Sequence, residues 1–559
     1  MTRHIRWQIL LILLGVVLVG ILLTYLAINY TTVLRPGRGG TYVEGVAGFP
    51  HYLNPLLSGY NDVDRDICAL VFSGLTRLNE RGEVKPDLAR GWEVTLDGLS
   101  YTFYLRSNAY WHDGTPLTAD DVVFTIGLLQ DPDFAGPSDL GFTLWQTVTV
   151  EKVDRSTVRF TLPEPYAPFL DYTTVGILPA HLLQPIRAAD LPAAEFNLNP
   201  VGSGPFQLEE IEIEAGSITA MVLERFPRYY RARPYLERIQ FRFYPSYQTA
   251  FNAYEAGEVE GIARITVNDL PRARVLPSLN LFSAQIAEYG IVLLNLGRSD
   301  LPFFQEQEVR QALLYALDRQ QIIDDVLQGQ ALVAHSPLLP GTWAYNDDIP
   351  RYEYAPDTAN RLLDEAGWIL PARSDGVRRK EGQRLAFTLL TSSEPERTGV
   401  AQMLAEQWSA VGVTVTVETA SALEVREALE NRDFEAILIH LALPGDPDPY
   451  PFWHETQVED GQNYAGFAHR RISEIVEQAR VIAKRERRQE LYYEFQEIFA
   501  QEVPALLLYV PVYTYGVDER IRNVQIGPLM HPSDRFRTIS EWWVVPRRVF
   551  VSESEAGRP

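Results

Sequence analysis

The chain has 559 residues and a formal net charge of −23. This length exceeds a single hydrophobic core, so we expect two or three domains. So acidic a surface argues against nucleic acid and anionic membrane surfaces as partners, and it suits a well-solvated monomer. The only cysteine, Cys68, excludes an internal disulfide bond and is expected to be buried among apolar neighbours.

An apolar run without charged residues extends from Ile9 to Ile28, after Arg3 and Arg6. A helix of about 20 residues spans the hydrocarbon core of a bilayer. The run does not end in a small-residue cleavage site, so we predict an uncleaved transmembrane signal-anchor over residues 9–28. Residues 1–8 would then be cytoplasmic, and the body would lie outside the membrane, at the cell surface or in the periplasm. Cleavage of the segment is the alternative, and residues 29–40 are expected to form a linker.

The block from Gly74 to Ile126 contains a complete supersecondary unit. Alternating side chains predict two strands, Trp92–Leu96 and Tyr101–Leu105, joined by an Asp-Gly pair that suits a tight hairpin turn. Thr118 and Asp121 have the spacing of a capping box, and the apolar stripe behind them predicts a helix. The aromatic side chains of this unit are expected to pack in a core.

The two halves of the chain differ in texture, which predicts a mixed α/β fold of two lobes. The first half is rich in hairpin signals, whereas strands and helices alternate in the second half. A strand near 288–296 leads into the second lobe and one near 505–515 leads back, an arrangement that suits a hinge with a ligand-binding cleft. The predicted divisions are lobe I with an inserted subdomain at 41–287, lobe II at 288–508, a return to lobe I at 509–548, and a disordered tail at 549–559.

Further motifs lie along the chain in a fixed order. They are GSGP (202–205), VRQALLYALDR (309–319), SP with PGTW (336–343), LLDEAGW (362–368) and DPDPYPFW (446–453). Together with the block at 74–126, they resemble the family 5, or peptide-type, solute-binding proteins of ABC importers. The similarity spans about residues 40 to 545.

This resemblance implies a periplasmic-binding-protein-like fold of type II, in its large cluster C form with an extra subdomain. It implies that the two lobes close on a peptide or another small solute and deliver it to the transmembrane permease subunits of an ABC importer. It requires no cofactor and no catalytic chemistry. The family also takes sugars and metal chelates.

The chain departs from the family pattern near its Asp-Pro loop. In the best-known peptide binders, a Trp and an Asp precede this loop, and the Asp pairs with the α-amino group of the peptide. Alignment on Asp448-Pro449 places Gly445 at the Asp position and Ala442 at the Trp position. Asp446, one residue away, either substitutes for that Asp or caps a turn.

Candidate ligand contacts are polar or aromatic residues on loops that are expected to face the cleft. Aromatic rings suit flat pocket walls and an Asp supplies a counter-charge for a cation, although ordinary loop packing is the alternative for each residue. We expect specificity to lie mainly within residues 440–464. The candidates are Tyr60, Asn61, Trp343, Tyr345, His440, Asp446, Asp448, Tyr450, Trp453, His454, Asn463, Tyr464 and Tyr513.

The sequence contains no strong catalytic motif. It has no Gly-x-Ser-x-Gly elbow, no His-Glu-x-x-His pair and no phosphate-binding P-loop. His112-Asp113 and Asp120-Asp121 could suggest a metal site, but turn and helix-cap roles explain them better. We therefore predict a binding protein and not an enzyme, with a hydrolase as a distant alternative. A ligand sensor for a membrane receptor and a binder of a non-peptide solute, such as an oligosaccharide, are the nearer alternatives.

Overall fold

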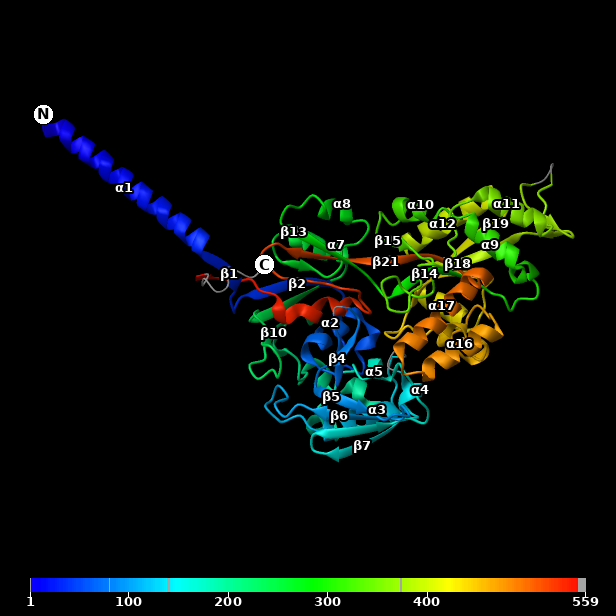
Figure 1. The fold of residues 1–559 in the computed structure, drawn as a ribbon, viewed down its shortest axis with the longest axis horizontal. Helices are drawn as coiled ribbons and strands as arrows, with labels where there is room; N and C mark the ends of the chain where they lie inside the picture. The colour runs from blue at the N-terminus through cyan, green and yellow to red at the C-terminus, as the bar shows by residue number, and fades with distance from the viewer. Residues whose placement is uncertain (1, 80, 138–140, 372–374, 551–559) are drawn as a thin grey trace.

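Two large hydrophobic cores organise the protein in the computed structural model, which describes residues 2–79, 81–137, 141–371 and 375–550 (Figure 1). One core combines residues between Tyr42 and Ala263 with residues between Tyr513 and Trp542. The other contains buried residues between Tyr289 and Val510. We call the bodies around these cores lobe I and lobe II.

Each lobe contains both helices and strands. Those of lobe I are β2 (Thr41–Ala47), α2 (Asp62–Val71), β3 (Thr76–Leu78), β4 (Val84–Pro86), β5 (Ala89–Val94), β6 (Ser100–Leu105), α3 (Ala119–Gln130), α4 (Phe142–Trp145), β7 (Thr149–Asp154), β8 (Thr157–Thr161), α5 (Phe169–Tyr172), α6 (Ala180–Leu183), β9 (Phe206–Glu214), β10 (Ser217–Arg225), β11 (Arg238–Tyr244), α7 (Tyr247–Glu255), β12 (Gly261–Ile262), α8 (Leu270–Ala273) and β13 (Leu279–Gln285). Those of lobe II are β14 (Glu288–Leu294), α9 (Gln307–Tyr315), α10 (Arg319–Asp325), β15 (Ala331–Val333), α11 (Pro356–Glu365), β16 (Arg379–Lys380), β17 (Gln383–Arg384), β18 (Ala386–Ser392), α12 (Pro395–Ala410), β19 (Thr414–Ala420), α13 (Ala422–Glu430), β20 (Ala436–Ala442), α14 (Tyr450–Trp453), α15 (Gln457–Asp460), α16 (Arg470–Val481) and α17 (Arg485–Glu502). The chain then continues through β21 (Ala505–Asp518) and η6 (Pro532–Glu541), and further 3-10 turns occupy Ser58–Tyr60, Ala188–Ala193, Glu195–Leu198 and Pro302–Gln305.

One mixed sheet connects the lobes, in the order β19-β18-β20-β14-β21-β12-β2-β11-β10-β9. The first residues of β21 pair with β14 and β15 in lobe II, and its last residues pair with β12 and β13 in lobe I. Figure 1 shows β21 reaching from one lobe into the other. The chain passes between the lobes at residues 286–287 and along β21, so two adjacent segments connect the two cores.

The hairpin and capped helix predicted from the block at 74–126 are present. β5 pairs antiparallel with β6, and the Asp121 carboxylate accepts the backbone N–H of Thr118 at 2.8 Å. The predicted extent of the first strand was wrong, because β5 ends at Val94 and Leu96 is fully exposed in the turn. Alternation alone could not locate that end, since the turn continues the same apolar–polar pattern.

Two of the sequence motifs pack directly against each other. His112 accepts the N–H of Gly202 at its Nδ1 (3.1 Å), and its Nε2 lies 3.2 Å from the carbonyl oxygen of Gly204. This pairing requires a neutral ring with its proton on Nε2. The glycines are needed for contact with α2: a Cβ on Gly202 would lie 1.8 Å from the carbonyl oxygen of Val71.

Acid is expected to destabilise the protein through His112. Burial is the main cause that lowers the pKa of His112 to about 4 from its usual 6.5. Between pH 6.5 and about pH 4, His112 is protonated in the unfolded chain but neutral in the folded protein. The free energy of unfolding is therefore highest near pH 7 and falls as the pH drops through this range. We expect a loss of about 2 kcal/mol from this residue between pH 7 and pH 5, measured by urea denaturation. A His112→Gln variant with an unchanged pH dependence would contradict this origin.

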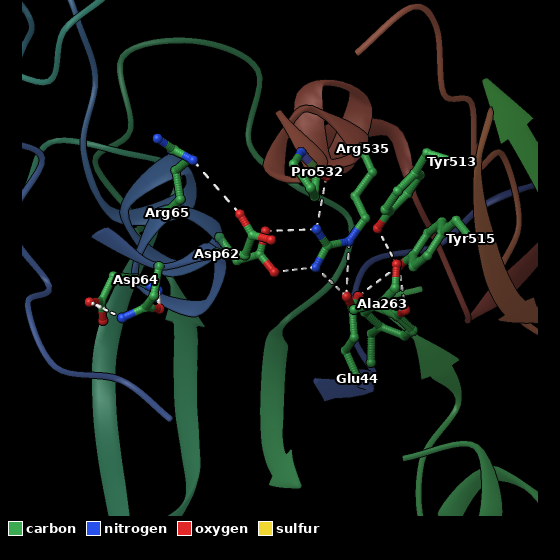
Figure 2. Close-up of polar contacts among 12 residues, drawn as sticks. Glu44, Asp62, Asp64, Arg65, Ala263, Tyr513, Tyr515, Pro532 and Arg535 are labelled. Carbon is green, nitrogen blue, oxygen red and sulfur yellow. Dashed lines mark hydrogen bonds and ion pairs between the residues drawn. The ribbon is translucent and has the colours of Figure 1, made fainter. Parts of the chain in front are cut away.

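A buried ion cluster joins the two ends of lobe I (Figure 2). The guanidinium of Arg535 on η6 is fully buried and donates to Glu44 on β2 at 2.5 and 3.0 Å. It also donates to both oxygens of Asp66 on α2, at 2.5 and 2.7 Å. Tyr42 and Tyr515 donate their hydroxyl protons to the Glu44 carboxylate at 2.9 and 2.7 Å. The C-terminal segment is thereby tied to the first strand and first helix of the lobe.

The segments outside the lobes differ from the sequence prediction. α1 (Thr2–Thr31) extends away from the body, and β1 (Thr32–Pro36) pairs antiparallel with β22 (Pro546–Phe550) (Figure 1). Residues 29–40 are therefore helix and strand as well as linker, and the first two residues of the predicted tail belong to β22. The rest of that tail, 551–559, lies outside the described residues. Among the residues that the structure describes, no helix combines the length and apolar character needed to cross a membrane, so the anchor predicted at 9–28 is not confirmed.

Candidate ligand-binding site

The loop between β20 and α14 carries two of the predicted carboxylates, and both form ion pairs with arginines of lobe II. Asp446 accepts bonds from both terminal nitrogens of Arg488 on α17, one of them at 2.9 Å. Asp448 accepts the Nε–H of Arg480 on α16 at 2.7 Å. Asp448 also caps its own loop by accepting the N–H of Tyr450. The sequence suggested that Asp446 either binds a ligand ammonium group or caps a turn. Neither interpretation anticipated that its partner is an arginine of the same protein.

Aromatic rings surround these ion pairs. The guanidinium of Arg480 lies 4.0 Å from the ring centre of Tyr450, which itself stacks on His454. The guanidinium of Arg488 lies 5.1 Å from the ring centre of Trp343. Contacts of this kind hold the flat faces of guanidinium groups and keep both arginines in place.

A short segment of lobe I completes the cluster. The N–H of Ala167 donates to the carbonyl oxygen of Arg480 at 2.7 Å, and the ring of Tyr166 lies against the same guanidinium. Asp171 on α5 follows, and burial together with the charge of Asp446 raises its pKa to about 7. The two lobes therefore meet here through polar groups. We call Asp171, Asp446, Asp448, Arg480 and Arg488 the interlobe cluster.

A second polar group lies near the crossings between the lobes. Nε2 of His440 lies 3.0 Å from the hydroxyl of Tyr509 on β21, and Nδ1 lies 3.5 Å from Glu288 on β14. Burial opposes ionisation of Glu288, but His440 and the charges of Arg264 and Arg397 outweigh it and hold the pKa of Glu288 below its usual value. Arg264 belongs to lobe I and is exposed, so charged groups from both lobes face each other here as well.

Four predicted contacts are buried or pack against the hydrophobic cores. The side-chain nitrogen of Asn463 donates to the carbonyl oxygens of His454 and Phe467, and the hydroxyl of Tyr513 donates to the carbonyl oxygen of Ala263. Trp453 is buried in lobe II, and Tyr464 packs on the same core. The polar groups of Asn463 and Tyr513 are used within the protein in this conformation, which favours the loop-packing alternative for these two residues.

The remaining predicted contacts are scattered, except that His454 stacks on Tyr450. Asn61 caps α2 by accepting the N–H of Asp64 at 2.9 Å, and Tyr60 beside it is exposed. His454 is buried, with its Nε2 at 3.1 Å from Glu477. Tyr345 is half-buried on the loop after β15, and its pKa is raised by burial. The structure thus brings together Trp343, Asp446, Asp448, Tyr450 and His454, and it places His440 in the other polar group.

Sequence reasoning missed Asp171, Arg480, Arg488 and Arg264. The arginines lie on helices whose charged residues resemble an ordinary solvated face, and their partners come from distant loops. Asp171 is found only in the tertiary structure. A Cβ built on Gly445 would lie 2.8 Å from its Oδ1, so the glycine at the unusual position leaves the space that this carboxylate fills.

The residues considered for a metal site have other partners. Asp113 pairs with His181 at 2.7 Å and Asp121 caps α3, as the turn and helix-cap interpretation predicted. Within the described ranges, no group of three or more His, Cys, Asp or Glu side chains is arranged to hold a metal ion.

Comparison with known proteins gives extensive matches. The family model described as bacterial extracellular solute-binding proteins, family 5 Middle, matches residues 83–463. The chain is 31% identical over 518 residues to the oligopeptide-binding protein AppA of Bacillus subtilis (strain 168), a match that covers 91% of this chain and 92% of the relative. The structure of B. subtilis AppA in complex with a nonapeptide matches with a TM-score of 0.73 at 30% identity, covering 91% of this chain and 100% of that one.

A relative with a different ligand has the same fold. The structure of NikZ from Campylobacter jejuni, in complex with Ni(L-His), matches with a TM-score of 0.73 at 26% identity, covering 90% of this chain and 99% of that one. These matches extend across both lobes and share the two-lobed mixed α/β architecture. The chain therefore belongs to the bacterial extracellular solute-binding proteins, family 5, which are the extracytoplasmic ligand-binding components of ABC importers.

Proposed function

We propose that the protein captures peptides between its two lobes and delivers them to a membrane permease, without chemical conversion of the ligand. The observation that carries this proposal is the similarity to oligopeptide-binding AppA over almost the whole of both chains. The interlobe cluster supports it, because charges of both signs beside aromatic rings suit a ligand that has charged ends and a polar backbone.

Hinge closure follows from the connectivity. Two neighbouring segments join the cores, so the lobes can rotate about them while each core stays intact. A ligand that contacts both lobes stabilises the closed arrangement by its differential affinity for the two states. The contact between Ala167 and Arg480 is of the kind that closure forms.

Ligand binding can be tested on the full-length protein purified in detergent. We expect mass spectrometry of the purified protein to detect intact co-purifying peptides, and a library of peptides from two to nine residues to raise the melting temperature. A ligand at 100 times its Kd stabilises a protein by about 2.7 kcal/mol. Failure of every peptide to shift the transition, with protein stripped of endogenous ligand, would exclude peptide transport.

A non-peptide solute is the second candidate, favoured by the NikZ structure with a nickel–histidine complex. Measuring the melting temperature with oligosaccharides and metal chelates distinguishes the two candidates. A protein that binds a non-peptide solute should show a higher melting temperature with that solute and no change with peptides. A sensor role predicts crosslinking of the liganded protein to a receptor, whereas the importer role predicts crosslinking to permease subunits.

We also propose that residues 9–28 anchor the protein to the membrane as a monomer, with the body extracytoplasmic. The described side chains of α1 support this, since Leu14, Val17, Leu18 and Ile21 are all more than half exposed. The mass of the mature protein tests it: an intact N-terminus in a membrane fraction resistant to alkaline extraction is expected, and a cleaved, released body would refute it.

A further inference from the structure

The interlobe cluster contains three carboxyl groups but only two guanidinium groups. Arg488 pairs with Asp446, and Arg480 pairs with Asp448. In the part of the chain that the structure describes, the carboxylate of Asp171 forms no hydrogen bond or ion pair with another residue. The cluster is therefore complete except for a partner to this one carboxylate.

The position of Asp171 makes its unpaired carboxylate energetically unfavourable. Its side chain is half-buried on α5, and Oδ1 lies 2.8 Å from the place where a side chain on Gly445 would begin. The rings of Tyr166 and Tyr172, 6.1 Å apart, pack beside it on the same segment. A carboxylate removed from water without a partner is destabilising, and proteins usually satisfy such groups or use them.

We propose that Asp171 binds a primary ammonium group of the ligand when the lobes close, with Gly445 leaving the space that the Asp171 side chain occupies. This inference rests on the proposed peptide-binding function and names the group that sets its specificity. The α-amino group of a peptide and the side chain of a lysine share this chemistry.

The composition of the cluster selects a monovalent cation. Two guanidinium groups stand within it and repel a divalent metal ion, while one unpaired carboxylate requires one positive charge. Aromatic rings on both sides suit the methylene groups and the cationic head of an ammonium ligand. The carboxylate comes from lobe I and the glycine from lobe II, so recognition of the ammonium is coupled to closure.

The experiment measures affinity by calorimetry for three peptides in the full-length protein: a free peptide, its N-acetylated form, and an N-acetylated form with one lysine. We expect N-acetylation to weaken binding roughly 10- to 100-fold, the usual range for a bond to a charged group. If the acetylated lysine peptide recovers the affinity, the lysine side chain can also supply the ammonium group that Asp171 binds. If it does not, Asp171 binds the α-amino group of the peptide alone.

Asp171→Asn keeps the shape of the side chain and removes its charge. We expect it to bind the free peptide 10- to 100-fold more weakly and to bind the acetylated peptide as the unaltered protein does. The matched control is Asp120→Asn, an exposed carboxylate on α3 that pairs with Lys152. Its affinity for all three peptides should be unchanged.

Gly445→Ala tests the same contact with the carboxylate intact. Its added Cβ would displace Asp171, so we expect a similar loss for the free peptide and none for the acetylated one. Equal affinity of the Asp171→Asn and unaltered proteins for the free peptide would overturn this inference while leaving peptide binding in place. If the unaltered protein binds no peptide at all, both the proposed peptide-binding function and this inference about Asp171 fail. The experiment therefore distinguishes failure of the inference alone from failure of the function.

Discussion

Replacing Arg535 by Met is expected to lower the free energy of unfolding of lobe I by about 3 to 5 kcal/mol. The variant leaves Glu44 and Asp66 buried without their cation, and both carboxylates are almost fully excluded from water. Two tyrosine hydroxyls remain on Glu44, but they cannot neutralise two negative charges. The loss should fall on lobe I alone, because the residues of the cluster all belong to its core or its covering elements.

Differential scanning calorimetry measures the effect, and we expect a separate transition for each lobe. Arg187→Met is the matched control, since Arg187 is 79% exposed and pairs with the exposed Asp190. Exposed pairs contribute about 0 to 1 kcal/mol, so this variant should melt almost as the unaltered protein does. Equal shifts in the two variants would show that the buried cluster is not a stabilising unit, and a shift in lobe II would show that the lobes do not unfold separately.

Local features of this fold could be predicted from the sequence. The capping box of α3 was found because both of its partners lie within four residues of each other, at Thr118 and Asp121. The strand that carries the chain back into lobe I was found because β21 is a long apolar run, buried along nearly its whole length. Patterns of this kind depend on neighbours in the chain, so they survive without knowledge of the tertiary structure.

The candidate site could be predicted only in part, because its contacts join distant segments. Asp446 was singled out as a carboxylate on a suspect loop, but its partner Arg488 stands 42 residues away on a helix. Tyr513 on β21 was singled out by residue type, and only the tertiary structure shows that its hydroxyl donates to the carbonyl oxygen of Ala263 in lobe I. Strand β21 is buried on both faces, so alternation could not separate inward from outward side chains.

The departure at Gly445 was visible in the sequence, but its meaning was not. An absent side chain gives no indication of what occupies its space. Only the tertiary structure places Asp171, from the opposite lobe, against that glycine. The carboxylate beside this position therefore comes from the opposite lobe.

Gly202→Ala is expected to destabilise lobe I by about 3 kcal/mol, near the upper end of the usual cost of overpacking. The new Cβ would lie 1.8 Å from the carbonyl oxygen of Val71, and that oxygen accepts the N–H of Gly204 at 2.8 Å. Neither side of the clash is a flexible side chain, so the end of α2 must shift. The shift would also disturb the bond that Gly202 donates to His112.

Gly127→Ala is the control, and its expected effect has the opposite sign. Gly127 lies inside α3, and no atom outside the helix backbone lies within 4 Å of the position of its Cβ. Alanine in a helix interior is favoured over glycine by about 0.5 to 1 kcal/mol, so this variant should be slightly stabilised. Urea denaturation gives the change in the free energy of unfolding for both variants. If the two changes had the same sign, the contact with Val71 would not be the reason for glycine at position 202. Opposite signs would assign the glycine of the GSGP motif to packing against α2, and hence to the scaffold of lobe I and not to ligand binding.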